Sequence, residues 1–151
     1  MAERRRDFSA GCLEAAIVAE PVIDKVAWVH LEGGRILSTR SQGKDKYYLP
    51  GGKRESGETD AQCLQREISE ELAVSLKPET LRSVGVFEAQ AHGHAPGRNV
   101  RMSCYAAEYE GTLAASAEIA EFVWLAYADR ERCSPVDQII FDWLRDRGDL
   151  S

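Results

Sequence analysis

Apolar residues recur along this chain with two periods, and the change of period marks the expected elements. Residues 22–31 alternate and are rich in β-branched side chains, a Gly33-Gly34 pair follows, and residues 35–40 resume the pattern. This predicts a β-hairpin, because alternation at period two puts one side of each strand in the core. Residues 47–50 predict a short extended piece that leads into a glycine-rich loop.

Three more strands are expected in the second half of the chain. Residues 81–89 and 99–109 predict two strands joined by a loop over residues 91–98. The second of these strands carries Val100, Met102, Cys104 and Ala106 at every second position. Residues 122–127 predict a further strand.

Two helices are expected, each with its own start signal. Thr59 and Gln62 form a capping box for a helix over residues 59–72. Its apolar stripe consists of Ala61, Leu64, Ile68 and Leu72. Ser134-Pro135 predicts the start of a final helix, since proline suits the first helical position. We expect its buried face to hold Val136, Ile139, Ile140, Trp143 and Leu144.

This order of elements, mostly strands with one helix in the middle and one at the end, favours an α/β (α+β) fold with a mixed sheet between helices. The length of 151 residues suits one domain. We expect that domain over residues 13–151, after a loose tail over residues 1–12. The apolar stretch over residues 13–19 is ambiguous.

The helix over residues 59–72 carries the chemistry. Glu67, Glu70 and Glu71 stand at i, i+3 and i+4, so they are expected on one helix face, roughly opposite the apolar stripe. Carboxylate oxygens suit Mg²⁺ or Mn²⁺, which commonly takes one or two carboxylates together with water and substrate phosphates. Gly51, Gly52 and Gly57 precede this helix, and residues without a Cβ let backbone approach a ligand closely.

The spacing of these residues resembles the signature of the Nudix hydrolase family. Gly52 is followed after five residues by Glu58, after seven more by Arg66-Glu67, and after two more by Glu70-Glu71. Six fixed residues give a chance match on the order of 10⁻⁷ to 10⁻⁸ per starting position. The expected order of strands and helices is also similar to the α/β/α sandwich of that family, from about residue 22 onward.

The resemblance implies a function and a set of roles. It implies cleavage of a pyrophosphate linkage in a nucleoside triphosphate or a nucleoside diphosphate derivative, by attack of water on phosphorus. By resemblance, Glu67, Glu70 and Glu71 ligate Mg²⁺ or Mn²⁺, and the main-chain carbonyl of Gly52 adds an oxygen ligand. Glu58 and Arg66 form a structural pair.

Residues outside the motif complete the expected site. Members of the family often take a general base from a loop before the last strand, which makes Glu118 the candidate, with Glu121 as its neighbour in the expected strand. Lys53 and Arg40 are candidates for contact with substrate phosphate. His92 and His94 have no evident third metal ligand, so a hairpin loop is the favoured interpretation of that segment.

The sequence departs from the family pattern at one position. Ala73 stands where the pattern has glycine at the end of the helix. A left-handed residue there would cost alanine about 1–2 kcal/mol. The alternative is that the helix continues past this point.

Composition narrows the class of protein. A net charge of −6 argues against a nucleic-acid-binding surface, so no stable nucleic-acid partner is expected. No run of 18 apolar residues occurs in the sequence, so no membrane span is expected. The cysteines lack metal-binding spacing, which is typical of reduced thiols in a cytoplasmic protein.

Two other function classes stay open alongside the hydrolase. One is a non-catalytic, nucleotide-sensing Nudix-like module, which is expected to have lost the metal carboxylates that this chain retains. The other is a prenyl diphosphate isomerase on the same fold, for which the sequence offers no convincing cysteine and glutamate pair. The exact substrate and the oligomeric state stay open, although homodimers are frequent among proteins of this kind.

Overall fold

The computed structural model describes residues 22–151, so the expected tail over residues 1–12 and the apolar stretch 13–19 lie outside the described residues. The strands are β2 Ile23–Trp28, β3 Leu31–Glu32, β4 Arg35–Ser41, β5 Gly51–Gly52, β6 Ser75–Leu76, β7 Arg82–Gln90, β8 Asn99–Ala106, β9 Tyr109–Glu110 and β10 Ile119–Leu125. The helices are α2 Asp60–Leu72 and α3 Pro135–Asp146, and η2 Pro78–Thr80 and η3 Tyr127–Arg132 are short 3-10 helices.

The central sheet is mixed and has the strand order β5-β2-β8-β7. Strand β2 runs parallel to β8, with Ile23 opposite Val100 and Trp28 opposite Tyr105, and antiparallel to β5. Strand β7 is antiparallel to β8. A second, antiparallel sheet has the order β10-β4-β3, and β6 pairs with β9.

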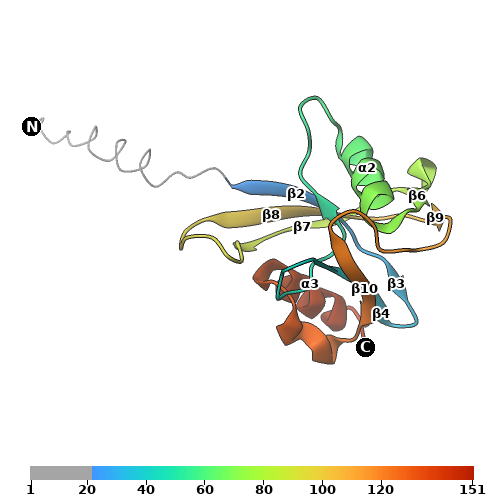
Figure 1. The fold of residues 1–151 in the computed structure, drawn as a ribbon. Helices are drawn as coiled ribbons and strands as arrows, with labels where there is room; N and C mark the ends of the chain where they lie inside the picture. Colours follow the sequence, from blue (N-terminus) through green and yellow to red (C-terminus); the bar gives the residue numbers. More distant parts are fainter. Residues whose placement is uncertain (1–21) are drawn as a thin grey trace, which may run out of the picture.

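Strand β2 shows why helices cover both faces of the central sheet. Val26 and Trp28 belong to one apolar cluster, together with residues of α2 such as Ile68. Ile23 and Ala27, on the alternate side, belong to a second cluster with residues of α3 such as Phe141. Figure 1 shows α2 and α3 on opposite sides of these strands. The expected sandwich with a mixed sheet is confirmed.

Helix α2 begins as the sequence predicts. The Thr59 side chain accepts a hydrogen bond from the Gln62 N–H at 3.1 Å, and the Gln62 side chain accepts one from the Thr59 N–H at 3.0 Å. The helix ends at Ala73, which has φ 62° and ψ 28°. Alanine therefore adopts the left-handed conformation that glycine occupies more readily, and the helix does not continue.

The start of α3 at Ser134-Pro135 is confirmed, but its predicted buried face is partly wrong. Ile139 is 41% exposed, whereas Phe141 is fully buried. The helix packs against β7 through a row that includes Val136, Ile140 and Leu144 and through Phe141 beside it. With this face of α3 against the sheet, Ile139 points toward solvent.

The predicted hairpin of residues 22–31 with 35–40 is also wrong for most of its length. Strand β2 ends at Trp28 and pairs with β5 and β8 instead, and only the two residues of β3 pair with β4. Strand β2 has buried apolar residues on both faces, Val26 and Trp28 on one and Ile23 and Ala27 on the other, and this fits the centre of a sheet, which a local hairpin does not provide. Strand β8 ends at Ala106, and β10 begins three residues before the predicted start at residue 122.

Two expectations from composition can be compared with the described residues. Cys63, Cys104 and Cys133 are buried free cysteines, which agrees with the expectation of reduced thiols. Over residues 22–151, no helix has the length and apolar character needed to cross a membrane.

Candidate active site

The glycine loop lies directly against helix α2 and strand β2. A Cβ added to Gly51, which has φ 146°, would lie 2.0 Å from the backbone oxygen of Val26. A Cβ added to Gly52 would lie 2.3 Å from Oε2 of Glu67. Gly51 therefore requires glycine. At Gly52 the close neighbour is the end of a flexible side chain, which places a carboxylate of the motif against the loop backbone.

Glu71 is the most deeply placed carboxylate of the motif. Its side chain is buried, and Oε1 accepts a hydrogen bond from the Gly51 N–H at 3.2 Å. Burial raises the pKa of Glu71 to about 8, although that N–H opposes the shift. Burial also raises the pKa of Glu67, while Glu70 is exposed.

The expectation that the three carboxylates lie roughly opposite the apolar stripe is wrong for Glu71. At 100° per residue, position 71 lies only about 20° around the helix from Leu64. Glu71 thus points into the protein beside the stripe. Glu67 lies at the edge of the buried face and Glu70 faces solvent.

Arg66 ties the motif together. Its guanidinium donates to both oxygens of Glu58, at 2.7 and 2.9 Å, and to Oε2 of Glu67 at 3.2 Å. It also reaches the main-chain oxygen of Lys53 at 3.1 Å and lies 3.6 Å from Oε1 of Glu70. These contacts lower the pKa of Glu58 to about 2 and raise the pKa of Arg66. Arg66 holds the loop on the helix, in agreement with a positioning role for the Glu58–Arg66 pair.

Backbone hydrogen bonds bring Glu118 to the same place. The N–H groups of Ala114 and Ser116 donate to the last carbonyls of α2, those of Leu72 and Glu71, each at 3.0 Å. These carbonyls have no partner inside the helix, so the loop caps its end. Glu118 follows in a turn, before the first residue of β10, and its charge adds to the raised pKa of Glu71.

Glu121 and Arg40 lie apart from this group. Glu121 is in β10 and accepts hydrogen bonds from Arg40 at 2.9 Å and from the Tyr47 hydroxyl at 2.8 Å. Arg40 also donates to the main-chain oxygen of Lys44 at 3.2 Å. The guanidinium of Arg40 is thus engaged, and Arg40 does not line the cavity described next.

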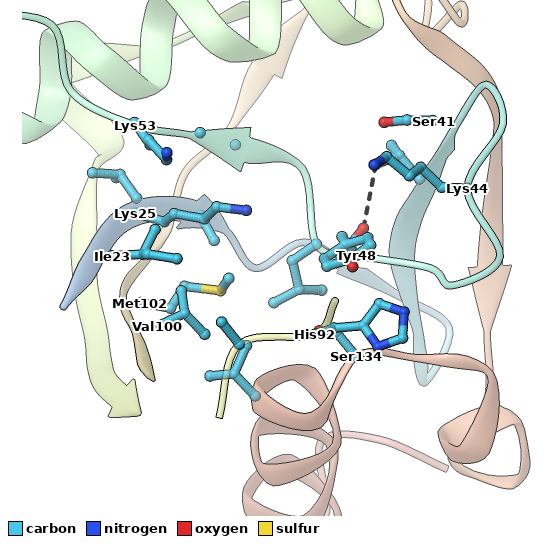
Figure 2. A pocket seen from close by; sticks show the side chains of 18 of the residues that line it. Ile23, Lys25, Ser41, Lys44, Tyr48, Lys53, His92, Val100, Met102 and Ser134 are labelled. Atoms are coloured by element: carbon cyan, nitrogen blue, oxygen red, sulfur yellow. Dashed lines mark hydrogen bonds between the residues drawn. The ribbon is translucent and has the colours of Figure 1, made fainter. Parts of the chain in front are cut away.

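A cavity of about 320 Å³ lies beside the glycine loop. Gly51, Gly52, Lys53, Glu71 and Glu118 line one side of it, whereas Glu67 and Glu70 do not. Apolar side chains also line the cavity, among them Ile23, Val100 and Met102, which lie together in Figure 2. One cavity thus brings the acidic motif next to a surface that suits a flat organic group.

Lys25 and Tyr48 line the cavity but were not candidates from the sequence, and His92 and His94, interpreted there as a hairpin loop, line it as well. His92 lies 3.2 Å from Asp45, and its ring is tilted toward that of Tyr48 with 6.4 Å between centroids. Lys25 Nζ lies 5.5 Å from the centroid of the Tyr48 ring. The sequence does contain a sign of this position. Ile23, Lys25 and Ala27 stand at every second position of a strand, so the lysine shares the inward face of its two apolar neighbours.

The oxygen atoms of the motif suit a divalent cation. Glu67, Glu70, Glu71 and the Gly52 carbonyl offer the hard oxygen atoms that Mg²⁺ and Mn²⁺ prefer. The space that a Cβ on Gly52 would fill lies against the Glu67 carboxylate, so the loop backbone and this carboxylate are neighbours. Within residues 22–151, no three acidic, histidine or cysteine side chains already form a group that could hold a metal ion. The donors fit in kind, and Arg66 holds Glu67 and Glu70 beside the loop.

Comparison with known proteins agrees with the family that the motif resembles and with the fold. The NUDIX domain family model matches residues 23–144. A 49-residue segment is 43% identical to the human 8-oxo-dGDP phosphatase NUDT18, covering 32% of this chain and only 15% of that protein. The solution structure of the E. coli ORF135 protein covers 84% of this chain and 93% of its own, with TM-score 0.65 and 25% identity. The MutT protein from Methanosarcina mazei Go1 covers 86% and 97%, with TM-score 0.67 and 18% identity.

Proposed function

The chain belongs to the NUDIX domain family, and from this premise we propose that it is a metal-dependent pyrophosphohydrolase. Its substrate is a nucleoside triphosphate or a nucleoside diphosphate derivative, cleaved at the diphosphate linkage. The observation that carries the proposal is the meeting of Gly52, Glu67 and Glu71 with Glu118 beside one cavity. The human relative matched over 49 residues is an 8-oxo-dGDP phosphatase, which adds oxidised guanine nucleotides to the candidate substrates.

The residues have separate tasks. Glu67, Glu70, Glu71 and the Gly52 carbonyl would hold Mg²⁺ or Mn²⁺. When bound, such an ion neutralises phosphate oxygens and lowers the pKa of coordinated water. Lys53, exposed at the mouth of the cavity, binds the phosphate chain through its ammonium group. Arg40 is not assigned to the phosphate chain, because its guanidinium already donates hydrogen bonds to the Glu121 carboxylate and to the main-chain oxygen of Lys44.

The reaction forms one bond and breaks another at phosphorus. A water oxygen attacks the phosphorus atom, the bond from phosphorus to the bridging oxygen breaks, and the leaving phosphate departs with that oxygen. Glu118 accepts the proton that the water loses. A transition state of this kind needs positioning and charge neutralisation more than covalent help from the protein.

The test is a substrate panel with identified products. It contains normal and 8-oxo nucleoside di- and triphosphates, nucleotide sugars and dinucleoside polyphosphates, each with Mg²⁺, with Mn²⁺ and with chelator. Metal-dependent release of phosphate, pyrophosphate or a nucleoside monophosphate supports the hydrolase. Binding without turnover would favour a sensor, and conversion of a prenyl diphosphate without release of phosphate would favour an isomerase.

A further inference from the structure

Lys25 occupies an unusual position on the floor of the cavity. It belongs to the side of β2 that holds Ile23 and Ala27, which are 6% and 1% exposed. In the parallel pairing it stands opposite Met102, also buried. Its aliphatic stem therefore runs among apolar side chains, and Figure 2 shows its nitrogen ending between Lys53, Tyr48 and Met102.

The ammonium group of Lys25 has no hydrogen-bond acceptor among residues 22–151. It lies over the face of the Tyr48 ring, 5.5 Å from the centroid. Burial lowers the pKa of Lys25, against the charges of Asp137 and Glu71, and neither carboxylate forms an ion pair with it. Removing a polar group from water without a partner is costly, so this position suits a ligand that supplies the acceptor.

The surroundings specify what kind of acceptor that is. Lysine offers three donors and no acceptor, so its ligand presents oxygen or nitrogen lone pairs. The apolar side chains of Val100 and Met102 and the ring of Tyr48 suit a flat aromatic group. Lys53, Glu67 and Glu71 also act electrostatically on Lys25, so the phosphate chain lies close to it. The neighbouring apolar side chains of Val100 and Met102 are what favour the ring as the partner of Lys25.

Among the purines, guanine matches this donor. Its O6 and N7 atoms are adjacent acceptors on one edge, whereas adenine presents N7 next to an amino group that donates. An 8-oxo purine of the guanine series keeps O6 as an acceptor, but its N7 carries a hydrogen and donates, so on this edge only O6 is left to accept from the lysine. An ammonium group that faces adenine can donate only to N7, and the N6 amino group beside it is a donor that cannot accept from the lysine.

We propose that Lys25 is a specificity-determining residue that selects a keto purine by donating hydrogen bonds to its O6/N7 edge. This inference rests on the proposed function, because it assigns the cavity to the base of the same nucleotide. The Lys25 stem, Val100 and Met102 hold the ring, and Lys53 remains on the phosphate side.

The test compares the wild type with Lys25→Met in kcat/KM for dGTP, 7-deaza-dGTP and dATP. Methionine keeps the length of the stem and removes the donors. We expect the ratio of dGTP to dATP to fall roughly tenfold or more in the variant, with dATP nearly unchanged. Replacing N7 of dGTP by carbon lowers kcat/KM of the wild type and leaves the variant unaffected. Thermal unfolding verifies that the variant is folded.

Two lysine variants serve as controls. Lys53→Met is expected to lower kcat/KM for all three nucleotides equally, and Lys46→Met, whose Nζ donates to the Glu131 carbonyl outside the cavity, to change none. If Lys25→Met lowered kcat/KM equally for all three nucleotides, Lys25 would bind phosphate. If the ratio of kcat/KM for dGTP to that for dATP did not change, Lys25 would not recognise the base. Either result overturns the inference.

Binding measurements separate this inference from the proposed function. Calorimetric titration with GMP and AMP requires no turnover, and we expect the wild type to bind GMP roughly tenfold more tightly. That preference disappears in Lys25→Met. A wild type that hydrolyses no nucleotide but shows this preference would reject the hydrolase and retain the role of Lys25. Equal binding of GMP and AMP by the wild type would reject the role of Lys25, whatever the activity.

Discussion

The backbone N–H of Gly51 donates a hydrogen bond to Oε1 of Glu71 across 3.2 Å, joining the glycine loop to the last turn of α2. Gly51 is itself fixed by the close approach of Val26, so the buried carboxylate is held by the most constrained backbone in the site. The second oxygen of Glu71 remains available toward the cavity, which this residue lines.

Glu71→Gln removes the negative charge of this side chain and keeps its shape. Glutamine retains a carbonyl oxygen that accepts from Gly51, so the free energy of unfolding is expected to change little. Turnover is expected to fall on the order of 10²-fold or more, since the charge near phosphate is lost. Glu79→Gln, in exposed η2, is the matched control for steady-state kinetics with Mg²⁺. A rate near that of the wild type would refute the assigned metal site.

Glu118→Gln tests the general base. The loop that carries Glu118 is held by hydrogen bonds from its backbone to the end of α2, which this substitution leaves in place. We expect turnover to fall by more than about tenfold, which corresponds to about 1.4 kcal/mol. KM is expected to change little. A smaller decrease in kcat would locate the base elsewhere in the site.

Gly52→Ala and Gly51→Ala are expected to fail in different ways. At Gly52 the new Cβ meets the end of the flexible Glu67 side chain at 2.3 Å, so the carboxylate moves and the fold survives. We expect kcat/KM to fall at least tenfold with a normal unfolding curve. At Gly51 the Cβ meets the Val26 backbone at 2.0 Å, and the free energy of unfolding is expected to fall by about 3 kcal/mol or more. Equal stability of the two variants would contradict this distinction.

Local signals in the sequence identified the parts of the site that depend on neighbouring residues. The capping box at Thr59 and the spacing of Glu67, Glu70 and Glu71 follow from short segments, whereas Glu118 was a candidate only through the family resemblance. The capping box and the carboxylate spacing are each decided within a few residues of chain, so one sequence suffices to predict them.

Features that depend on distant partners were predicted less well. The pairing of β2 with β5 and β8 joins residues far apart in sequence, and the glycine turn after Glu32 favoured a local hairpin instead. The inward position of Lys25 depends on which side of β2 the helix α3 covers. The exposure of Ile139 likewise depends on how α3 is rotated against β7.

Ala73→Gly is expected to stabilise the protein. Ala73 has φ 62°, a left-handed conformation that costs a residue with a Cβ about 1–2 kcal/mol and costs glycine little. After the greater flexibility of glycine in the unfolded chain is subtracted, we expect a gain of about 1 kcal/mol in denaturant unfolding. Ala61→Gly, inside the same helix, is the control and is expected to lose about 0.5–1 kcal/mol. A loss in both variants would show that Ala73 carries no strain.

Asp137 provides a test of pH dependence away from the acidic motif. It is 1% exposed and accepts a hydrogen bond from the Leu49 N–H at 2.9 Å, and burial raises its pKa to about 7 from 3.8, against the attraction of Lys25. The folded state therefore keeps a proton that the unfolded chain has released. The contribution of Asp137 to stability is greatest below about pH 4 and falls as pH rises toward 7.

Asp137→Asn removes this titration and keeps an acceptor for Leu49. Between pH 4 and 7 the wild type is expected to lose free energy of unfolding relative to the variant. Above pH 7 the difference between the two is expected to stay constant. Asp142→Asn is the control with the opposite sign, because hydrogen bonds from Arg130 lower the pKa of Asp142 below 3.8. That pairing stabilises the folded state above the ordinary pKa and is lost in acid. If the two differences showed the same dependence on pH, burial of Asp137 would not be the cause.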